Sequence, residues 1–141
     1  MRVFLSLILF ISLQACATAA PSLPGSVTPP QDIPQRQKGG GKARIALLAQ
    51  GQNAFVGRLE LAPGIGVPEH QDATEEYIYV IAGSGILTMD GKEYPVEAGS
   101  MIYMPANATV SFKNGPEPMI GVQVFAGPGP ATKYDTWQVS E

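Results

Sequence analysis

The stretch from Gly64 to Gly83, which reads G-I-G-V-P-E-H-Q-D-A-T-E-E-Y-I-Y-V-I-A-G, indicates how this chain folds. It contains His70, the only histidine in the sequence. Residues two apart on a β-strand share a face, so His70 and Asp72 are predicted to point the same way. Glu76 begins the apolar run that follows. If these two segments pair, one imidazole and two carboxylates meet at the mouth of a pocket.

On both sides of this stretch, short apolar runs alternate with turn residues. Glycine and proline contribute 16 and 13 residues, which favours turns and short strands over long helices. Asp90-Gly91 is a strong two-residue hairpin signal. Strands are predicted at 44–50, 55–61, 77–82, 86–89, 92–96, 101–104, 109–112 and 119–125. The 77–82 strand is apolar at every position and is expected to be buried on both sides. This pattern predicts one all-β sandwich or barrel over residues 43–141.

The same residues resemble two motifs of the cupin superfamily. The matches to the first motif (64–83) are Gly64, His70, Glu76 and Gly83, and those to the second (99–114) are Gly99, Pro105 and Asn114. Asn107 stands where the second motif has a glycine, and asparagine tolerates the left-handed backbone better than most residues. The resemblance implies a small double-stranded β-helix, or jelly-roll barrel, of the cupin type.

The resemblance also implies a metal site, of which this sequence keeps only part. The family uses three histidines and one glutamate, but here two of the histidine positions are Asp72 and Val110. His70, Asp72 and Glu76 remain, and they suit at most a weakly held divalent ion such as Mn²⁺. A single histidine excludes the two-His-one-carboxylate iron site and the three-His zinc site within one subunit. No cofactor is therefore expected to bind tightly.

Three interpretations of His70, Asp72 and Glu76 stay open. In the first, His70 is a structural residue that hydrogen-bonds to one of the carboxylates and holds the barrel mouth together. In the second, the three side chains bind a metal ion weakly. In the third, His70 is a general base and Glu76 is its partner in metal-free catalysis, so these two are the catalytic candidates.

Other side chains are predicted to line the barrel pocket, although a plain hydrophobic core explains most of them more simply. They are Arg58, Met101, Tyr103, Val110, Phe112 and Gln123. Arg58 and Gln123 are polar residues on otherwise apolar strands, so either could hold an anionic group.

The N-terminus has the pattern of an export signal. Arg2 precedes an apolar run that is too short to cross a bilayer core of ~30 Å. Residues 13–16 (L-Q-A-C) then resemble a bacterial lipobox. This implies a signal peptide over residues 1–15, lipidation of Cys16, and an anchor in the outer membrane facing the periplasm. The alternative is plain secretion with cleavage after Ala19.

A segment of different composition separates the signal from the barrel. Residues 16–42 carry several prolines and Gly39-Gly40-Gly41 but few large apolar side chains. Such a segment cannot bury enough surface to offset its ordering entropy, so it is predicted to be a flexible tether. At the other end of the chain, Tyr134 and Trp137 are expected to pack back on the barrel.

Composition and resemblance together limit the function. The net charge of −3 and the lack of a basic run argue against nucleic acid as a partner. We expect a cell-envelope protein that binds a small polar or anionic ligand or has a structural role. Membrane contact is expected only through the lipid anchor, and a homodimer only by family analogy. The alternative is a weakly metal-dependent isomerase, decarboxylase or dioxygenase acting on a small acid or sugar. Loss of two metal positions favours the non-enzymatic roles.

Overall fold

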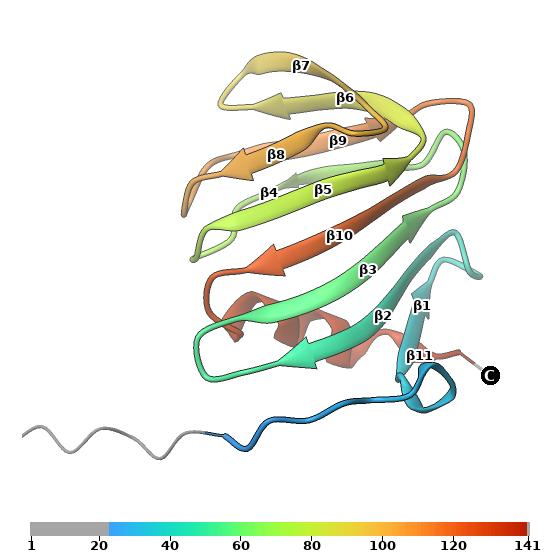
Figure 1. The fold of residues 1–141 in the computed structure, drawn as a ribbon. Coiled ribbons are helices and arrows are strands. Elements are labelled where there is room, and N and C mark those ends of the chain that lie inside the picture. Colours follow the sequence, from blue (N-terminus) through green and yellow to red (C-terminus); the bar gives the residue numbers. More distant parts are fainter. Residues whose placement is uncertain (1–22, 141) are drawn as a thin grey trace, which may run out of the picture.

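A computed structural model describes residues 23–140 as two antiparallel β-sheets that face each other (Figure 1). The larger sheet has the strand order β11-β1-β2-β3-β10-β5-β8, and the smaller sheet has the order β4-β9-β6-β7. The strands are β1 (Gln35–Lys38), β2 (Ala43–Gln50), β3 (Phe55–Leu61), β4 (Gly66–His70), β5 (Glu76–Ala82), β6 (Ser84–Met89), β7 (Lys92–Glu97), β8 (Met101–Met104), β9 (Val110–Asn114), β10 (Met119–Phe125) and β11 (Gln138–Val139). Two 3-10 helices, η1 (Pro30–Asp32) and η2 (Gly129–Thr136), complete the described structure. The prediction of an all-β jelly-roll barrel is confirmed.

Strand β5 shows how the two-residue period positions the site. Its burial alternates along the strand, and Glu76, Ile78 and Val80 are buried on the inner face. Tyr79 and Ile81 are 51% and 48% exposed on the outer face. The prediction that this strand is buried on both sides is therefore wrong, because nothing among the described residues covers the outer face of the sheet. The inward direction of Glu76 follows from sharing a face with two core residues.

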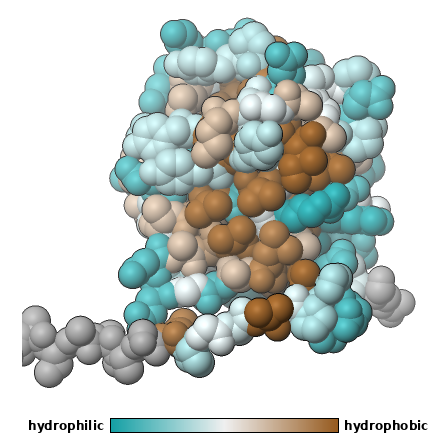
Figure 2. Space-filling model, viewed as in Figure 1, coloured by the Kyte–Doolittle hydropathy of each residue, from teal (hydrophilic) through white to brown (hydrophobic). Residues whose placement is uncertain are grey.

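The outer face of the larger sheet is apolar where β5 and β8 run side by side. Figure 2 shows hydrophobic residues gathered over the middle of this face. Tyr79 pairs with Met101 in register, and Tyr77 pairs with Tyr103 with ring centroids 5.2 Å apart. The strand pair therefore presents a continuous aromatic and aliphatic surface on the side away from the barrel interior.

Two hydrophobic clusters form the core. The first lies on the facing sides of the two sheets, around Val80, Leu87 and Ile102. The second cluster includes Ile45, Phe55, Phe125, Ala131 and Tyr134. Helix η2 belongs to the second cluster, since Tyr134 lies 5.8 Å from the Phe55 ring and Trp137 packs edge-on against Tyr134 at 5.1 Å. The expectation that the C-terminal tail packs back on the barrel is confirmed.

Residues in the left-handed region of the backbone explain several of the predicted turns. Asp90 and Gly91 have φ angles of 49° and 80°, as the tight hairpin between β6 and β7 requires. Asn107 has a φ of 63°, a conformation that asparagine tolerates. Gly83 has a φ of 86°, and a Cβ atom there would lie 2.4 Å from the Pro118 carbonyl oxygen. Only glycine fits at this end of the first motif.

The barrel begins earlier in the chain than predicted. Strand β1 pairs with β2 and with β11, so residues 35–42 belong to the larger sheet and not to a tether. The Gly39-Gly40-Gly41 run forms the turn between β1 and β2, with φ angles of 63°, 67° and 82°. The predicted signal peptide, the lipobox and Cys16 lie outside the described residues. Within residues 23–140, no helix combines the length and the apolar character needed to cross a membrane.

Candidate functional site

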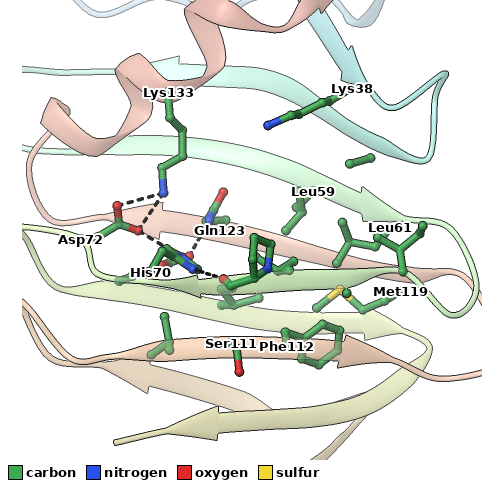
Figure 3. A pocket seen from close by; sticks show the side chains of 18 of the residues that line it. Lys38, Leu59, Leu61, His70, Asp72, Ser111, Phe112, Met119, Gln123 and Lys133 are labelled. Carbon is green, nitrogen blue, oxygen red and sulfur yellow. Dashed lines mark hydrogen bonds and ion pairs between the residues drawn. The ribbon is translucent and has the colours of Figure 1, made fainter.

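A cavity of about 650 Å³ lies inside the barrel between the two sheets (Figure 3). Most of its wall is aliphatic or aromatic, formed by Leu59, Leu61, Ile78, Leu87, Ile102, Met104, Val110, Phe112 and Met119. One corner is polar, and its residues are His70, Asp72, Glu76, Gln123 and Lys133. The cavity thus has a large apolar interior and a corner where these five polar side chains converge, and Lys38, Lys42 and Ser111 also line it.

The three residues singled out by the sequence come together at this corner. His70 ends β4, Asp72 lies in the loop that follows, and Glu76 is the first residue of β5. Strand β4 pairs with β9 in the smaller sheet, whereas β5 pairs with β10 and β8 in the larger one. The two segments therefore do not pair with each other and lie in different sheets. Even so, one ligand atom from each residue lies within 4.8 Å of the others.

His70 is oriented by the backbone of its own strand. Its Nδ1 lies 2.9 Å from the carbonyl oxygen of Pro68, which can only accept a hydrogen bond. Nδ1 is therefore the donor in this hydrogen bond, and Nε2 is the ring nitrogen that points to Asp72. Nε2 lies 3.7 Å from Oδ2 of Asp72. A hydrogen bond between His70 and a carboxylate, as the structural interpretation required, is absent at this distance.

Glu76 is a buried carboxyl group at the end of a hydrogen-bond chain. Its side chain accepts a hydrogen bond from Nε2 of Gln123, and the Tyr134 hydroxyl donates to Oε1 of Gln123 at 2.5 Å. Glu76 is only 4% exposed. Desolvation raises the pKa of Glu76 to about 7, although the Gln123 hydrogen bond and the charge of Lys133 act in the opposite direction. Burial likewise raises the pKa of the Tyr134 hydroxyl.

Lys133, on helix η2, completes the corner and was not anticipated from the sequence. Its Nζ donates to Oδ1 and Oδ2 of Asp72 at 2.9 and 2.7 Å. The same ammonium lies 4.8 Å from the centre of the Phe125 ring, within the range of a cation–π contact. No motif marks this lysine. The only signal in the sequence was that its neighbours Tyr134 and Trp137 were expected to fold back on the barrel.

The arrangement of His70, Asp72 and Glu76 does not suit tight binding of a metal ion. The spacing of the three ligand atoms would admit an ion, but both oxygens of Asp72 accept hydrogen bonds from the Lys133 ammonium. Oε1 of Glu76 is engaged by Gln123. Val110, where the family has its last histidine, stands opposite His70 in the strand register and offers only methyl groups. His70 is therefore the one nitrogen ligand left at this site, whereas Zn and Fe favour several.

The predicted pocket-lining residues divide into two groups. Val110, Phe112 and Gln123 line the cavity. The prediction is wrong for Arg58, Met101 and Tyr103, which are not among the residues that line it.

The reason is the side of the sheet on which each residue falls. Arg58 lies on the outer face of β3 and pairs with Glu60 at 3.2 Å. On β8 the inward positions are Ile102 and Met104, so Met101 and Tyr103 point outward. All four residues of β8 are apolar, and the pattern alone could not show which pair faces the cavity.

Comparison with known protein families matches residues 57–125 to the cupin domain. This segment of the chain is similar to the cupin domain. Its fold agrees with solved structures: an RmlC-like cupin from Shewanella frigidimarina superposes with a TM-score of 0.66. That alignment covers 74% of this chain and 92% of the other at 15% identity, so the likeness concerns the fold.

Two curated proteins that are similar to this chain are named for different reactions. Dimethylsulfoniopropionate lyase DddW of Ruegeria pomeroyi is 33% identical over 82 residues, covering 55% of this chain and 54% of the relative. The tetracenomycin polyketide synthase protein TcmJ of Streptomyces glaucescens is 32% identical over 93 residues, covering 64% of this chain and 60% of the relative. The chain thus matches little more than half the length of these relatives.

Proposed function

We propose that this cupin domain binds a small molecule with a mainly apolar body and one polar group inside the barrel. The observation that carries the proposal is the cavity itself. Its volume of about 650 Å³ lies within the ~300–1,000 Å³ typical of ligand pockets. A mainly apolar wall with a polar corner is suited to a ligand that buries its body among Leu61, Ile78 and Phe112 and turns its polar group toward Lys133.

The charges around the cavity favour an anionic polar group. Lys38 and Lys42 also line the cavity, and Figure 3 shows Lys38 projecting toward it, as Lys133 does. Within residues 23–140, the Lys38 and Lys42 side chains make no hydrogen bond or ion pair, although the Lys42 carbonyl accepts a hydrogen bond from the Ala62 backbone N–H. The total positive charge of the three ammonium groups therefore exceeds the negative charge of the two carboxylates, Asp72 and Glu76. The whole chain, in contrast, has a net charge of −3. A carboxylate on an apolar body is the ligand class that suits these charges.

A second candidate function is catalysis of a proton transfer on the bound molecule. Glu76 and His70 both line the cavity, and each has a hydrogen bond that orients it, from Gln123 to Glu76 and from His70 to the Pro68 carbonyl. This arrangement can move a proton to or from a group placed between them. The relatives named as a lyase and a polyketide synthase protein support an enzymatic role. A metal-dependent form is opposed by the ammonium group on Asp72.

We also propose that the protein is exported and anchored in the cell envelope through a lipid on Cys16. The support is the N-terminal sequence, in which a short apolar run is followed by the lipobox-like residues 13–16. An anchor of this kind would leave the barrel outside the cytoplasm, where ligands from the surroundings reach the cavity.

The binding proposal is tested by a thermal-shift screen of the purified protein with aromatic and medium-chain monocarboxylic acids. Matched alcohols test the anionic group, and small sugar acids test the apolar body. We expect the acids to raise the melting temperature, and Lys38→Met and the cavity-filling Val110→Phe to weaken the effect. Tyr79→Ala, on the outer face, is the control. Stabilisation by sugar acids alone, or equal stabilisation of the Val110→Phe variant, would contradict the proposal.

The catalytic candidate is tested on the acids that bind. Each is incubated with the protein in deuterated buffer, and mass spectrometry follows both chemical conversion and exchange of hydrogen for deuterium. Conversion or exchange that requires Glu76 supports catalysis. Bound acids that remain unchanged, without exchange, leave ligand binding as the function.

A further inference from the structure

The carboxylates of the candidate metal site already have a cation. Asp72 accepts two hydrogen bonds from the ammonium of Lys133, one at each carboxylate oxygen. The Asp72 side chain is only 13% exposed, which limits the screening of this ion pair by water. We propose that Lys133 is the built-in cation of this barrel, and that it excludes divalent metal from the site formed by His70, Asp72 and Glu76.

The packing of helix η2 holds Lys133 in position, so its contact with Asp72 is more than a chance surface contact. Helix η2 is anchored by Tyr134, which is 3% exposed and packs against Phe55 and Trp137. Because Tyr134 is fixed, the backbone of the preceding residue is fixed as well. The aliphatic chain of Lys133 then places Nζ over the Phe125 ring and against Asp72. A lysine on a mobile tail would lose more side-chain entropy in forming the same ion pair.

Two consecutive residues of η2 control both carboxylates of the site. Lys133 neutralises Asp72 directly, and Tyr134 acts on Glu76 through Gln123, since its hydroxyl donates to Oε1 of Gln123 while Nε2 of Gln123 donates to Glu76. These contacts engage both carboxylate oxygens of Asp72 and one of the two of Glu76. An ion entering the site has to displace the ammonium from Asp72 or remain beside a like charge, and either outcome weakens its binding.

Lys133 can also take over part of what a metal does for a ligand. An ammonium group has three N–H donors, and Asp72 accepts two of them. The third remains for an oxygen of a molecule in the cavity. The positive charge is then covalently attached to the chain, and ligand binding becomes independent of metal supply.

The inference is tested by substituting Lys133 and measuring metal binding, without any ligand. Lys133→Met removes the charge and keeps an unbranched apolar side chain. Lys38→Met is the matched control, because Lys38 lines the same cavity but makes no bond to a carboxylate. Mn²⁺ binding is measured by titration calorimetry and by electron paramagnetic resonance, and metal content is measured by elemental analysis after purification without chelators.

We expect Lys133→Met to bind Mn²⁺ at least tenfold more tightly than the wild type and Lys38→Met. The gain should disappear in the double variant Lys133→Met/His70→Ala. Lys133→Gln should show the same gain, and it replaces Lys133→Met if that variant does not fold by circular dichroism.

Two results would overturn the inference. One is a wild type that retains nearly one equivalent of Zn, Fe, Ni or Mn, lost with His70→Ala. The other is a folded Lys133 variant with unchanged Mn²⁺ affinity. Because these measurements use metal alone, they stand or fall independently of the proposed organic ligand.

Discussion

Replacing Glu76 by glutamine should change how the stability of the barrel depends on pH. Glu76 is 4% exposed, and burial raises the pKa of its carboxyl from an ordinary 4.5 to about 7. At about 1.4 kcal/mol per pKa unit, this rise corresponds to about 3 kcal/mol. Glutamine has the same shape, and its side-chain oxygen can still accept the hydrogen bond from Gln123.

The direction of the pH dependence follows from the pH at which Glu76 loses its proton in the folded and in the unfolded chain. Below pH 4.5 the carboxyl is protonated in both the folded and the unfolded chain, so burying it has no charge penalty. Between pH 4.5 and about 7 the unfolded chain releases the proton first, and the free energy of unfolding falls as the pH rises. Above pH 7 the full cost is present. Glu76→Gln should therefore stabilise the protein by up to about 3 kcal/mol at pH 8 and by little at pH 4.5.

The assay is urea unfolding followed by circular dichroism at pH 4.5, 6 and 8. The matched control is Glu93→Gln on the exposed strand β7, where the substitution removes the same charge from the surface. Glu76→Gln and the wild type are compared at each pH, so that other titrating groups cancel. A difference between them that does not grow with pH, or a variant less stable than the wild type at pH 8, would refute the argument.

Four further predictions follow from single contacts. Gly83→Ala should destabilise the barrel by about 2 kcal/mol or more in urea unfolding, because a Cβ would lie 2.4 Å from the Pro118 oxygen at a φ of 86°; an unchanged midpoint would contradict this. Asn114→Ala should cost about 3 kcal/mol, since its Nδ2 donates to three backbone carbonyls at 2.8–3.2 Å; a loss below about 1 kcal/mol would show that those bonds contribute little. Asp72→His combined with Val110→His should create a site that retains Zn²⁺ in elemental analysis, because Val110 stands opposite His70 in the register, and absence of Zn²⁺ would count against it. Cys16→Ser should shift the protein from the detergent phase to the aqueous phase; equal partitioning of both forms would exclude the lipid anchor.

Features that depend on neighbouring residues could be predicted from the sequence. The Asp90-Gly91 turn requires left-handed backbone at two successive positions, and that preference is local. Gln123 was predicted to line the pocket because it is a polar residue on an otherwise apolar strand, and it lies at a buried position of β10. Strand β1, in contrast, falls within the predicted tether, because residues 16–42 carry several prolines and few large apolar side chains. It forms because β2 and β11 pair with it on either side.

The sequence by itself determined the cupin barrel and the presence of an imidazole and two carboxylates at its first motif, because strand period, turn chemistry and motif spacing are all written within short stretches. Only the tertiary structure decided what those groups face. Lys133 lies 61 residues from Asp72 in the chain, and no local pattern relates them. They meet because helix η2 packs its buried tyrosine against Phe55 and Trp137, which carries the lysine to the cavity. The charge of the site therefore depends on a packing contact between distant segments, which a pattern of neighbouring residues cannot encode.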